Sequence, residues 1–181
     1  MTESVKTRMT AQAFFALPET NHLQQLINGE LILDAPKDVH QAAVGNCYHF
    51  LRQLKLGGKV RIAPTAVHFD DVNVVEPDVF WVSESNTLCV LGEDQHWHGA
   101  PDLIIEVLSP SSVRHDRVTK FQLYERYAVR EYWIVQPNVL TVEVWHLEES
   151  VFEYQNLYTL VDTFTSPTLK TTVQVHELLT E

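Results

Sequence analysis

The sequence lacks the features that define several large classes of protein. No apolar run approaches the ~18–20 residues that a transmembrane helix requires, and residues 1–8 lack the apolar stretch of a secretory signal. Cys47 and Cys89 are the only cysteines, too few for a disulfide framework and not at metal-ligand spacing. We therefore expect a cytoplasmic protein with free thiols and no membrane contact.

Common catalytic signatures are missing as well. The chain contains no Gly-x-x-x-x-Gly-Lys phosphate loop, no Gly-x-Gly-x-x-Gly and no Gly-x-Ser-x-Gly. It also has no internal repeat, low-complexity tract or interdomain linker. At 181 residues, of which 45% are hydrophobic, the chain fits one domain spanning residues 1–181.

Positive charge is scarce and unevenly distributed. The chain has 13 Lys and Arg against 24 Asp and Glu, a formal net charge of −11, which argues against strong non-specific binding to nucleic acid. Residues 131–181 hold eight of the acidic residues and one basic residue. Nine of the thirteen basic residues fall in two short stretches: Arg52, Lys55, Lys59 and Arg61, then Arg114, Arg117, Lys120, Arg126 and Arg130. These side chains either contact phosphates or decorate solvated helix faces.

The hydrophobic pattern predicts a mixture of helices and strands. Apolar residues recur at three- and four-residue steps over 39–56, which indicates a helix with one buried stripe that Gly57-Gly58 stops. Strand, helix and strand follow one another over 102–135, so part of the sheet should be parallel. The further predicted helices are 11–17 and 116–128, and the predicted strands are 30–33, 60–62, 66–69, 78–82, 102–108, 131–135, 140–145 and 151–158.

Glu106 interrupts the apolar segment Asp102-Leu-Ile-Ile-Glu-Val-Leu108. Burying a carboxylate costs several kcal/mol unless a partner compensates it. Strand alternation places Glu106 on one face with Ile104 and Leu108, where a core residue would otherwise lie. The alternatives are a buried salt bridge, for example to an arginine of the next helix, and a metal ligand, which explains the placement more directly.

Asp78 is the natural second ligand. It follows Pro77 and opens the strand Val79-Phe-Trp-Val82, so its side chain can reach a neighbouring strand. Two carboxylates from adjacent strands, with a backbone carbonyl and water, make the hard oxygen environment that Mg²⁺ or Mn²⁺ prefers. On its own, Pro77-Asp78 would also fit a simple turn. The prediction of a metal site rests on Asp78 and Glu106 taken together.

Lys120 is the candidate cation beside an attacking water. It lies on the helix that follows the Glu106 strand, with Arg117 one turn earlier on the same face. A lysine on a helix is also commonly just solvated.

His96 and His98 are a second possible metal pair, for zinc, but no third ligand is evident nearby and a loop tip is the simpler interpretation.

Several segments together resemble the Uma2 family, proposed to be bacterial endonucleases of the PD-(D/E)XK restriction-endonuclease-like superfamily. The resemblance covers nearly the whole chain, with its most specific part in the central block. It rests on Glu76-Pro77-Asp78-Val79, on 100–111 (Ala-Pro-Asp-Leu-Ile-Ile-Glu-Val-Leu-Ser-Pro-Ser), on Asp116-Arg117, Lys120 and Tyr124, on Glu131-Tyr-Trp-Ile-Val135 with Pro137, and on Thr10 to Pro18, Asn28-Gly-Glu-Leu31 and His40-Gln41.

The resemblance implies an α/β (α+β) fold with a restriction-endonuclease-like core, a mixed sheet flanked by helices. It implies that Asp78 and Glu106 bind Mg²⁺ or Mn²⁺ and that the substrate is DNA. The superfamily's lysine normally falls two residues after the glutamate, where this chain has Leu108, so Lys120 takes that role. Glu30 resembles an additional N-terminal acid of the superfamily.

These observations predict a metal-dependent DNA endonuclease with Asp78, Glu106 and Lys120 as catalytic residues. A second hypothesis is a nucleic-acid-binding or dimeric assembly module that retains the fold without turnover, which the negative charge and Leu108 favour. A third is a hydrolase of another phosphoester, since fold does not fix substrate. The apolar C-terminal strands could also form a homodimer interface.

Overall fold

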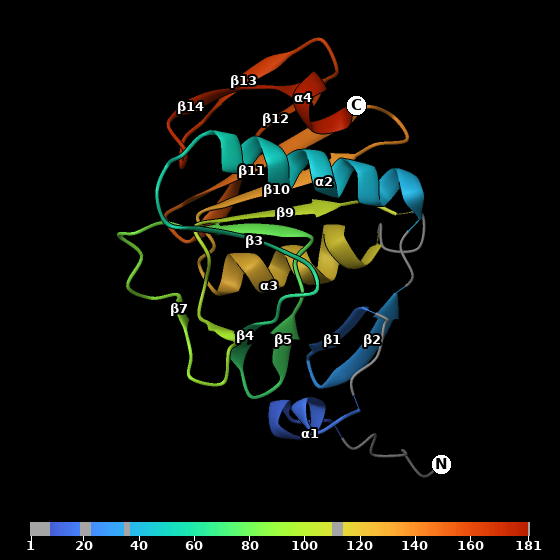
Figure 1. Ribbon diagram of the computed structural model, residues 1–181, viewed down its shortest axis with the longest axis vertical. Helices are drawn as coiled ribbons and strands as arrows, with labels where there is room; N and C mark the ends of the chain where they lie inside the picture. The colour runs from blue at the N-terminus through green and yellow to red at the C-terminus, as the bar shows by residue number, and fades with distance from the viewer. Residues whose placement is uncertain (1–7, 19–22, 35–36, 110–113, 181) are drawn as a thin grey trace.

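The computed structural model describes residues 8–18, 23–34, 37–109 and 114–180. Its centre is a six-stranded mixed sheet in the order β12-β11-β10-β9-β6-β3 (Figure 1). The strands are β3 (Lys59–Ile62), β6 (Val79–Val82), β9 (Leu103–Val107), β10 (Glu131–Gln136), β11 (Thr141–Glu148) and β12 (Val151–Thr159). Strands β9 and β10 are parallel, as the strand–helix–strand pattern predicted, and the other neighbours are antiparallel.

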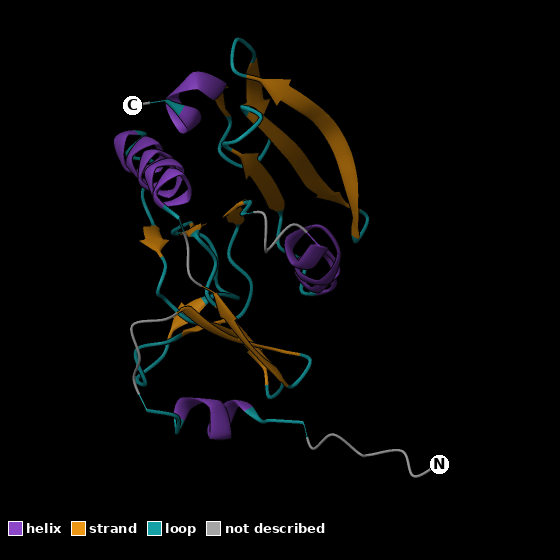
Figure 2. Cartoon of the chain, turned by 90° about the vertical axis from the view of Figure 1, so that its right-hand side faces the viewer, coloured by secondary structure: helices purple, strands orange, loops and turns teal. Residues whose placement is uncertain are grey.

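Helices cover both faces of this sheet. Helix α2 (Asp38–Gln53) packs on one face together with the hairpin β13 (Thr163–Ser166) and β14 (Thr171–Gln174) and helix α4 (Val175–Leu179). On the opposite face lie a π-helical segment, η1 (His115–Lys120), and helix α3 (Phe121–Arg126), which continues it. Figure 2 shows α2 and α3 end-on, on either side of the long strands. The predicted mixed sheet flanked by helices is confirmed.

A second, smaller sheet lies beside the α3 face in the order β2-β1-β5-β4-β8-β7. Its strands are β1 (Leu23–Ile27), β2 (Glu30–Asp34), β4 (Val67–Asp70), β5 (Asn73–Val75), β7 (Val90–Leu91) and β8 (Trp97–His98), and α1 (Ala11–Phe15) packs on it. Thr10 caps α1, since its hydroxyl accepts from the Ala13 amide at 3.2 Å. Strands β1 and β5 were not predicted, because both are short and β1 carries two glutamines.

Alternating side chains of the central strands fill two separate cores. Leu103, Ile105 and Val107 of β9 pack under α2, whereas Ile104 and Leu108 pack on the α3 side. Glu106 therefore points to the α3 face, as strand alternation predicted. Helix α2 ends at Gln53 rather than at Gly57-Gly58, because Lys55 already has a positive φ of 50°. The sequence Ser109-Pro-Ser-Ser112 predicts a break after this strand, and residues 110–112 lie outside the described residues.

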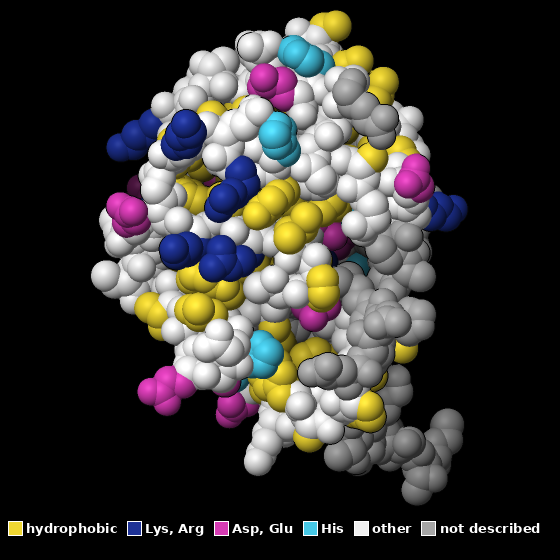
Figure 3. All heavy atoms as spheres, in the orientation of Figure 1, with side chains coloured by type: hydrophobic (Ala, Val, Ile, Leu, Met, Phe, Trp, Pro, Cys, Tyr) yellow, Lys and Arg dark blue, Asp and Glu magenta, His cyan; other side chains and the backbone are white. Residues whose placement is uncertain are grey.

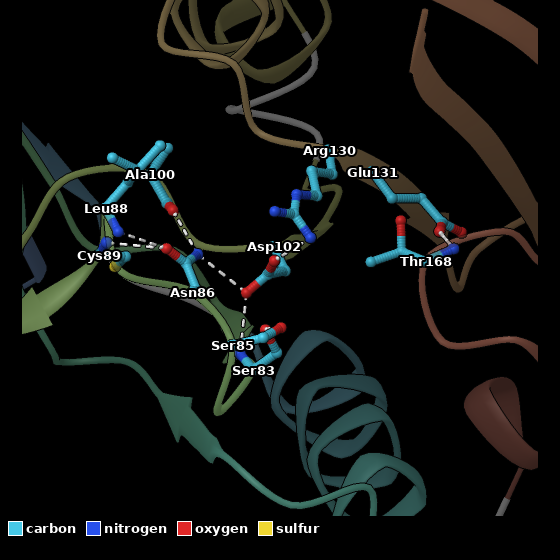
Figure 4. Close-up of polar contacts among 10 residues, drawn as sticks. All are labelled: Ser83, Ser85, Asn86, Leu88, Cys89, Ala100, Asp102, Arg130, Glu131 and Thr168. Carbon is cyan, nitrogen blue, oxygen red and sulfur yellow. Dashed lines mark hydrogen bonds and ion pairs between the residues drawn. The ribbon is translucent and has the colours of Figure 1, made fainter.

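Two further carboxylates of the central sheet hold the surrounding loops and hairpin in place (Figure 4). Asp102 accepts hydrogen bonds from the Ser83 amide at 2.8 Å and the Asn86 amide nitrogen at 2.9 Å, and it pairs with Arg130 at 2.9 Å. Glu131 accepts from the Ser166 hydroxyl and the Thr168 amide, both at 2.8 Å, which anchors the β13–β14 hairpin. Both carboxylates have structural partners on the loops that they fix.

Candidate active site

Strands β6 and β9 bring Asp78 and Glu106 to the same place. Val79 pairs with Ile105, so Asp78, which precedes β6, lies beside Glu106 on β9. The backbone amide of Val107 donates a buried hydrogen bond of 2.7 Å to Asp78 Oδ2, which fixes the aspartate against β9. Asp78 and Glu106 are only 6% and 1% exposed, so two carboxylates share a site that is almost closed to solvent.

The third predicted residue, Lys120, comes from the π-helical segment above them. Its Nζ lies 2.9 Å from Glu106 Oε1 and 3.3 Å from Asp116 Oδ1, and the side chain is buried. The wider π-helical turn sets Lys120 above the sheet, and such turns recur at functional sites. The buried partner of Glu106 is therefore this lysine, not an arginine of the helix. Lys120 is not a solvated surface lysine.

Tyr124 completes the surroundings of Glu106. It lies on α3 one turn after Lys120 and is fully buried, and its hydroxyl donates to Glu106 Oε1 at 2.5 Å. The ring also packs against Tyr132, with centroids 5.1 Å apart. Tyr124 therefore packs in the core and holds the glutamate at the same time.

These contacts leave one oxygen of each carboxylate available. Asp78 Oδ2 receives the Val107 amide and faces His40, while Glu106 Oε1 receives Lys120 and Tyr124. Within the described residues, no hydrogen bond or ion pair engages Asp78 Oδ1 or Glu106 Oε2. The neighbours thus hold both carboxylates in place without forming hydrogen bonds to Asp78 Oδ1 or Glu106 Oε2, and carboxylate oxygens are suitable ligands for a hard cation.

His40 is a neighbour of Asp78 to which the sequence analysis gave no role in the site. It lies in the first turn of α2, is 6% exposed, and places its Nε2 3.3 Å from Asp78 Oδ2. A signal was present in the sequence, because His40, Val44, Cys47 and Leu51 follow the spacing of the buried stripe of the helix. A histidine on that stripe must meet a polar partner in the core.

The electrostatics of the site follow from three carboxylates around one lysine. Burial raises the pKa of Glu106 to about 8, and the charges of Asp78 and Asp116 add to this while Lys120 opposes it. Burial alone would lower the pKa of Lys120, but Glu106, Asp116 and Asp78 outweigh it and raise that pKa above its ordinary value. Lys120 therefore stays protonated near neutral pH, so it serves as a cation and hydrogen-bond donor.

Glu76 is a further acid near this centre. Burial raises its pKa to about 7, against the opposing effects of the Gln24 amide, which donates to its carboxylate, and the charge of Lys120. Glu30, the acid that the resemblance suggested, is exposed at the start of β2 in the smaller sheet. Leu108 is buried in the α3-side core, and Lys120 from the helix lies near the glutamate instead.

The structure does not bring His96 and His98 together as a zinc pair. The His96 ring stacks on Phe15 at 4.2 Å, whereas His98 Nε2 lies 2.9 Å from Asp94 Oδ2. Over residues 8–18, 23–34, 37–109 and 114–180, no group of three or more His, Cys, Asp or Glu side chains is arranged to hold a metal ion. A cation at Asp78 and Glu106 would thus have two protein carboxylates and otherwise water or substrate oxygens, a ligand set that suits Mg²⁺.

Comparison with known proteins places the chain in a family. Residues 11–176 match the model of the Uma2 family, described as "Putative restriction endonuclease", and the chain belongs to this family. The crystal structure of a putative nuclease from Anabaena variabilis is similar, with a TM-score of 0.76 and 19% identity over 94% of this chain and 97% of that one. At this identity the likeness shows a common fold. No curated protein matches the chain.

No helix among the described residues is long and apolar enough to cross a membrane.

Proposed function

We propose that this protein is a divalent-metal-dependent endonuclease that hydrolyses phosphodiester bonds of DNA. The observation that carries the proposal is the pair of open oxygens, Asp78 Oδ1 and Glu106 Oε2, beside a buried, protonated Lys120. Membership of a family described as a putative restriction endonuclease supports the same class of reaction.

Asp78 and Glu106 are the residues that would hold the ion, Mg²⁺ or Mn²⁺. Bound there, the ion would neutralise phosphate charge and favour deprotonation of water. His40 and the Val107 amide keep Asp78 oriented, while Tyr124 keeps Glu106 oriented. Such neighbours commonly determine how well a carboxylate binds its metal.

Lys120 acts on the substrate side of the same centre. Because its pKa is raised, its ammonium group donates hydrogen bonds and does not remove a proton. We propose that it orients the attacking water and stabilises negative charge that develops on the phosphate. Asp116, whose Oδ1 lies 3.3 Å from the ammonium nitrogen, is a second carboxylate that holds this group in place.

Nicking of supercoiled plasmid tests the proposal. The purified protein should nick DNA with Mg²⁺ or Mn²⁺ and not with EDTA, and Glu106→Ala should remove this activity in protein that a melting curve shows to be folded. Equal nicking by Glu106→Ala would show that the reaction occurs elsewhere. Mn²⁺ titration separates the alternative, a non-catalytic assembly module, which would show no site-specific binding that depends on Asp78.

We also propose a homodimer formed along β12. This strand lies at the edge of the central sheet and exposes Val151, Tyr154 and Leu157. An exposed edge with apolar side chains favours pairing with another strand. Light scattering should give twice the chain mass, and Leu157→Lys should give the monomer. A monomeric parent protein would refute the dimer.

The two buried free cysteines fit a reducing cytoplasm, which we propose as the location of the protein.

A further inference from the structure

The candidate active site carries more negative than positive charge, so by itself it does not attract the proposed anionic substrate. Asp78, Glu106 and Asp116 surround Lys120, and Glu76 is close enough to act on it electrostatically. A phosphodiester is an anion, and charges of the same sign repel it until a cation is bound. Because the chain as a whole carries −11, the attraction that captures DNA must come from a local region of positive charge.

One part of the chain has this character. Residues 39–69 contain four Lys and Arg but no Asp or Glu. Among the described residues, none of the four forms an ion pair with a carboxylate, and Glu84, packed beside Gly57, is the acid at the border. We call the set the α2–β3 basic surface. It consists of Arg52 in the last turn of α2, Lys55 in the connection, and Lys59 and Arg61 on β3.

Strand geometry points part of this surface towards the catalytic side of the sheet. Val60 and Ile62 pack into the core under α2, so Lys59 and Arg61 project to the opposite face. That face also carries Glu106 and the α3-side core. The Arg61 guanidinium lies 5.5 Å from the centroid of the Trp97 ring and gives one of its five N–H groups to the Val60 carbonyl. Its other donors can reach a phosphate.

The strand register gives the spacing between Lys59 of this surface and the candidate active site. Lys59 pairs with Val82 and Ile62 with Val79, so four strand residues, about 13 Å, separate Lys59 from Asp78. The duplex rises about 3.4 Å per base pair, so the two sites lie about four base pairs apart. Figure 3 shows most of the visible Lys and Arg side chains on the side of the α2–β3 connection.

We propose that the α2–β3 basic surface binds the sugar–phosphate backbone of duplex DNA, about four base pairs from the bond held at Asp78 and Glu106. The position of that bond rests on the proposed function, whereas the binding itself needs no cleavage. The surface supplies the electrostatic attraction that the acidic site lacks, and its binding is sequence-independent because phosphates carry no base identity.

Fluorescence anisotropy with a labelled duplex in EDTA tests this binding without cleavage. The variant is Arg52→Gln/Lys55→Gln/Lys59→Gln, which keeps Arg61 and its contact with Trp97. Each phosphate contact contributes about 0.9 to the slope of log affinity against log salt. Between about 50 and 200 mM salt, wild-type affinity should therefore fall about 40-fold more than that of the variant.

A control separates this surface from net charge. Thr163→Glu/Thr172→Glu/Lys170→Gln makes the same change in net charge at exposed positions of the C-terminal region outside β12, and it should keep the wild-type salt slope. Equal slopes for wild type and basic-surface variant, or an equal loss in the control, would overturn the proposal. Lys59→Gln alone serves where the triple variant has a lower melting temperature. Nicking that fails while this binding persists removes the nuclease assignment and leaves the surface intact.

Discussion

Two buried glutamates of the central sheet look alike in sequence and differ in what surrounds them. Glu106 is 1% exposed on β9, and Glu131 is 0% exposed on the neighbouring strand β10. Each is a single acid embedded in apolar and aromatic strand residues. They point to opposite faces, Glu106 towards Lys120 and α3, and Glu131 towards the β13–β14 hairpin.

Their partners separate a structural acid from a candidate catalytic one. Both oxygens of Glu131 accept hydrogen bonds, from the Trp133 indole at 2.7 Å and from Ser166 and Thr168 at 2.8 Å. Glu106 has contacts on Oε1 only, from Lys120 and Tyr124. The saturated hydrogen bonding of Glu131 fits a structural role, whereas an open oxygen beside a second carboxylate is what the proposed metal site requires of Glu106.

The largest expected effect is on catalysis at Glu106. Glu106→Gln keeps the shape and the acceptor for Lys120 and Tyr124 but removes the charge that a cation needs. We expect plasmid nicking to fall by at least about 100-fold, with the metal-free melting temperature unchanged or higher because one of several crowded carboxylates is gone. A variant that loses melting temperature and keeps nicking would assign Glu106 to the fold instead.

The matched substitution in Glu131 should give the reverse result. Glu131→Gln turns one acceptor into a donor, which leaves at least one of the three buried donors unsatisfied. Urea unfolding should show a loss of about 1–3 kcal/mol. Nicking by the folded fraction should stay at the wild-type level. A strong loss of nicking at wild-type stability would show that the two glutamates do not differ as described.

Substitutions of His40 test whether metal binding by Asp78 depends on the contact between these two side chains. His40→Ala should weaken Mn²⁺ binding by about 10–100-fold, because such supporting contacts orient metal ligands. His40→Gln can again place a nitrogen donor near Asp78 Oδ2 and should recover most of the affinity. Isothermal titration measures the Mn²⁺ affinity of each variant, and a melting curve measures its stability. A positioning role predicts that His40→Ala lowers the affinity without unfolding the protein and that His40→Gln recovers the affinity. Equal Mn²⁺ affinity in His40→Ala would exclude it.

The smallest expected effect is a dependence of the free energy of unfolding on pH, which arises from Glu106 and not from Glu131. The folded-state pKa of Glu106 is about 8 against an ordinary 4.5, so the metal-free folded protein holds this proton more tightly. The stability from this group is complete below about pH 4.5 and falls as pH rises to about 8. Glu76, with a pKa of about 7, adds a change of the same sign.

Metal binding should respond in the opposite direction. A cation competes with the proton on Glu106, so Mn²⁺ affinity should rise by up to about tenfold per pH unit until about pH 8. Urea unfolding in EDTA and Mn²⁺ titration at pH 6 and 8 measure the two effects. In Glu106→Gln, the stability change with pH should be smaller. An equal pH dependence in the variant would show that another group is responsible.

Residue patterns alone predicted much of this architecture. The stripe of α2, the apolar run of β9 and the parallel β9–β10 pair were predicted and are confirmed, because period and burial are properties of local sequence. Strand alternation also fixed the face on which Glu106 lies. The residue patterns and the family resemblance both indicated Asp78, Glu106 and Lys120, and the structure brings these three residues together.

The sequence by itself thus determined most elements of the central sheet, their order along the chain, and the presence of charged groups in apolar strands. Only the tertiary structure decided which oxygens stay open, that His40 meets Asp78, and that Glu131 is saturated by Trp133, Ser166 and Thr168. The physical reason is that a buried charge is balanced by groups distant along the chain. Period and composition report whether a residue is buried, but only packing reports what it touches there.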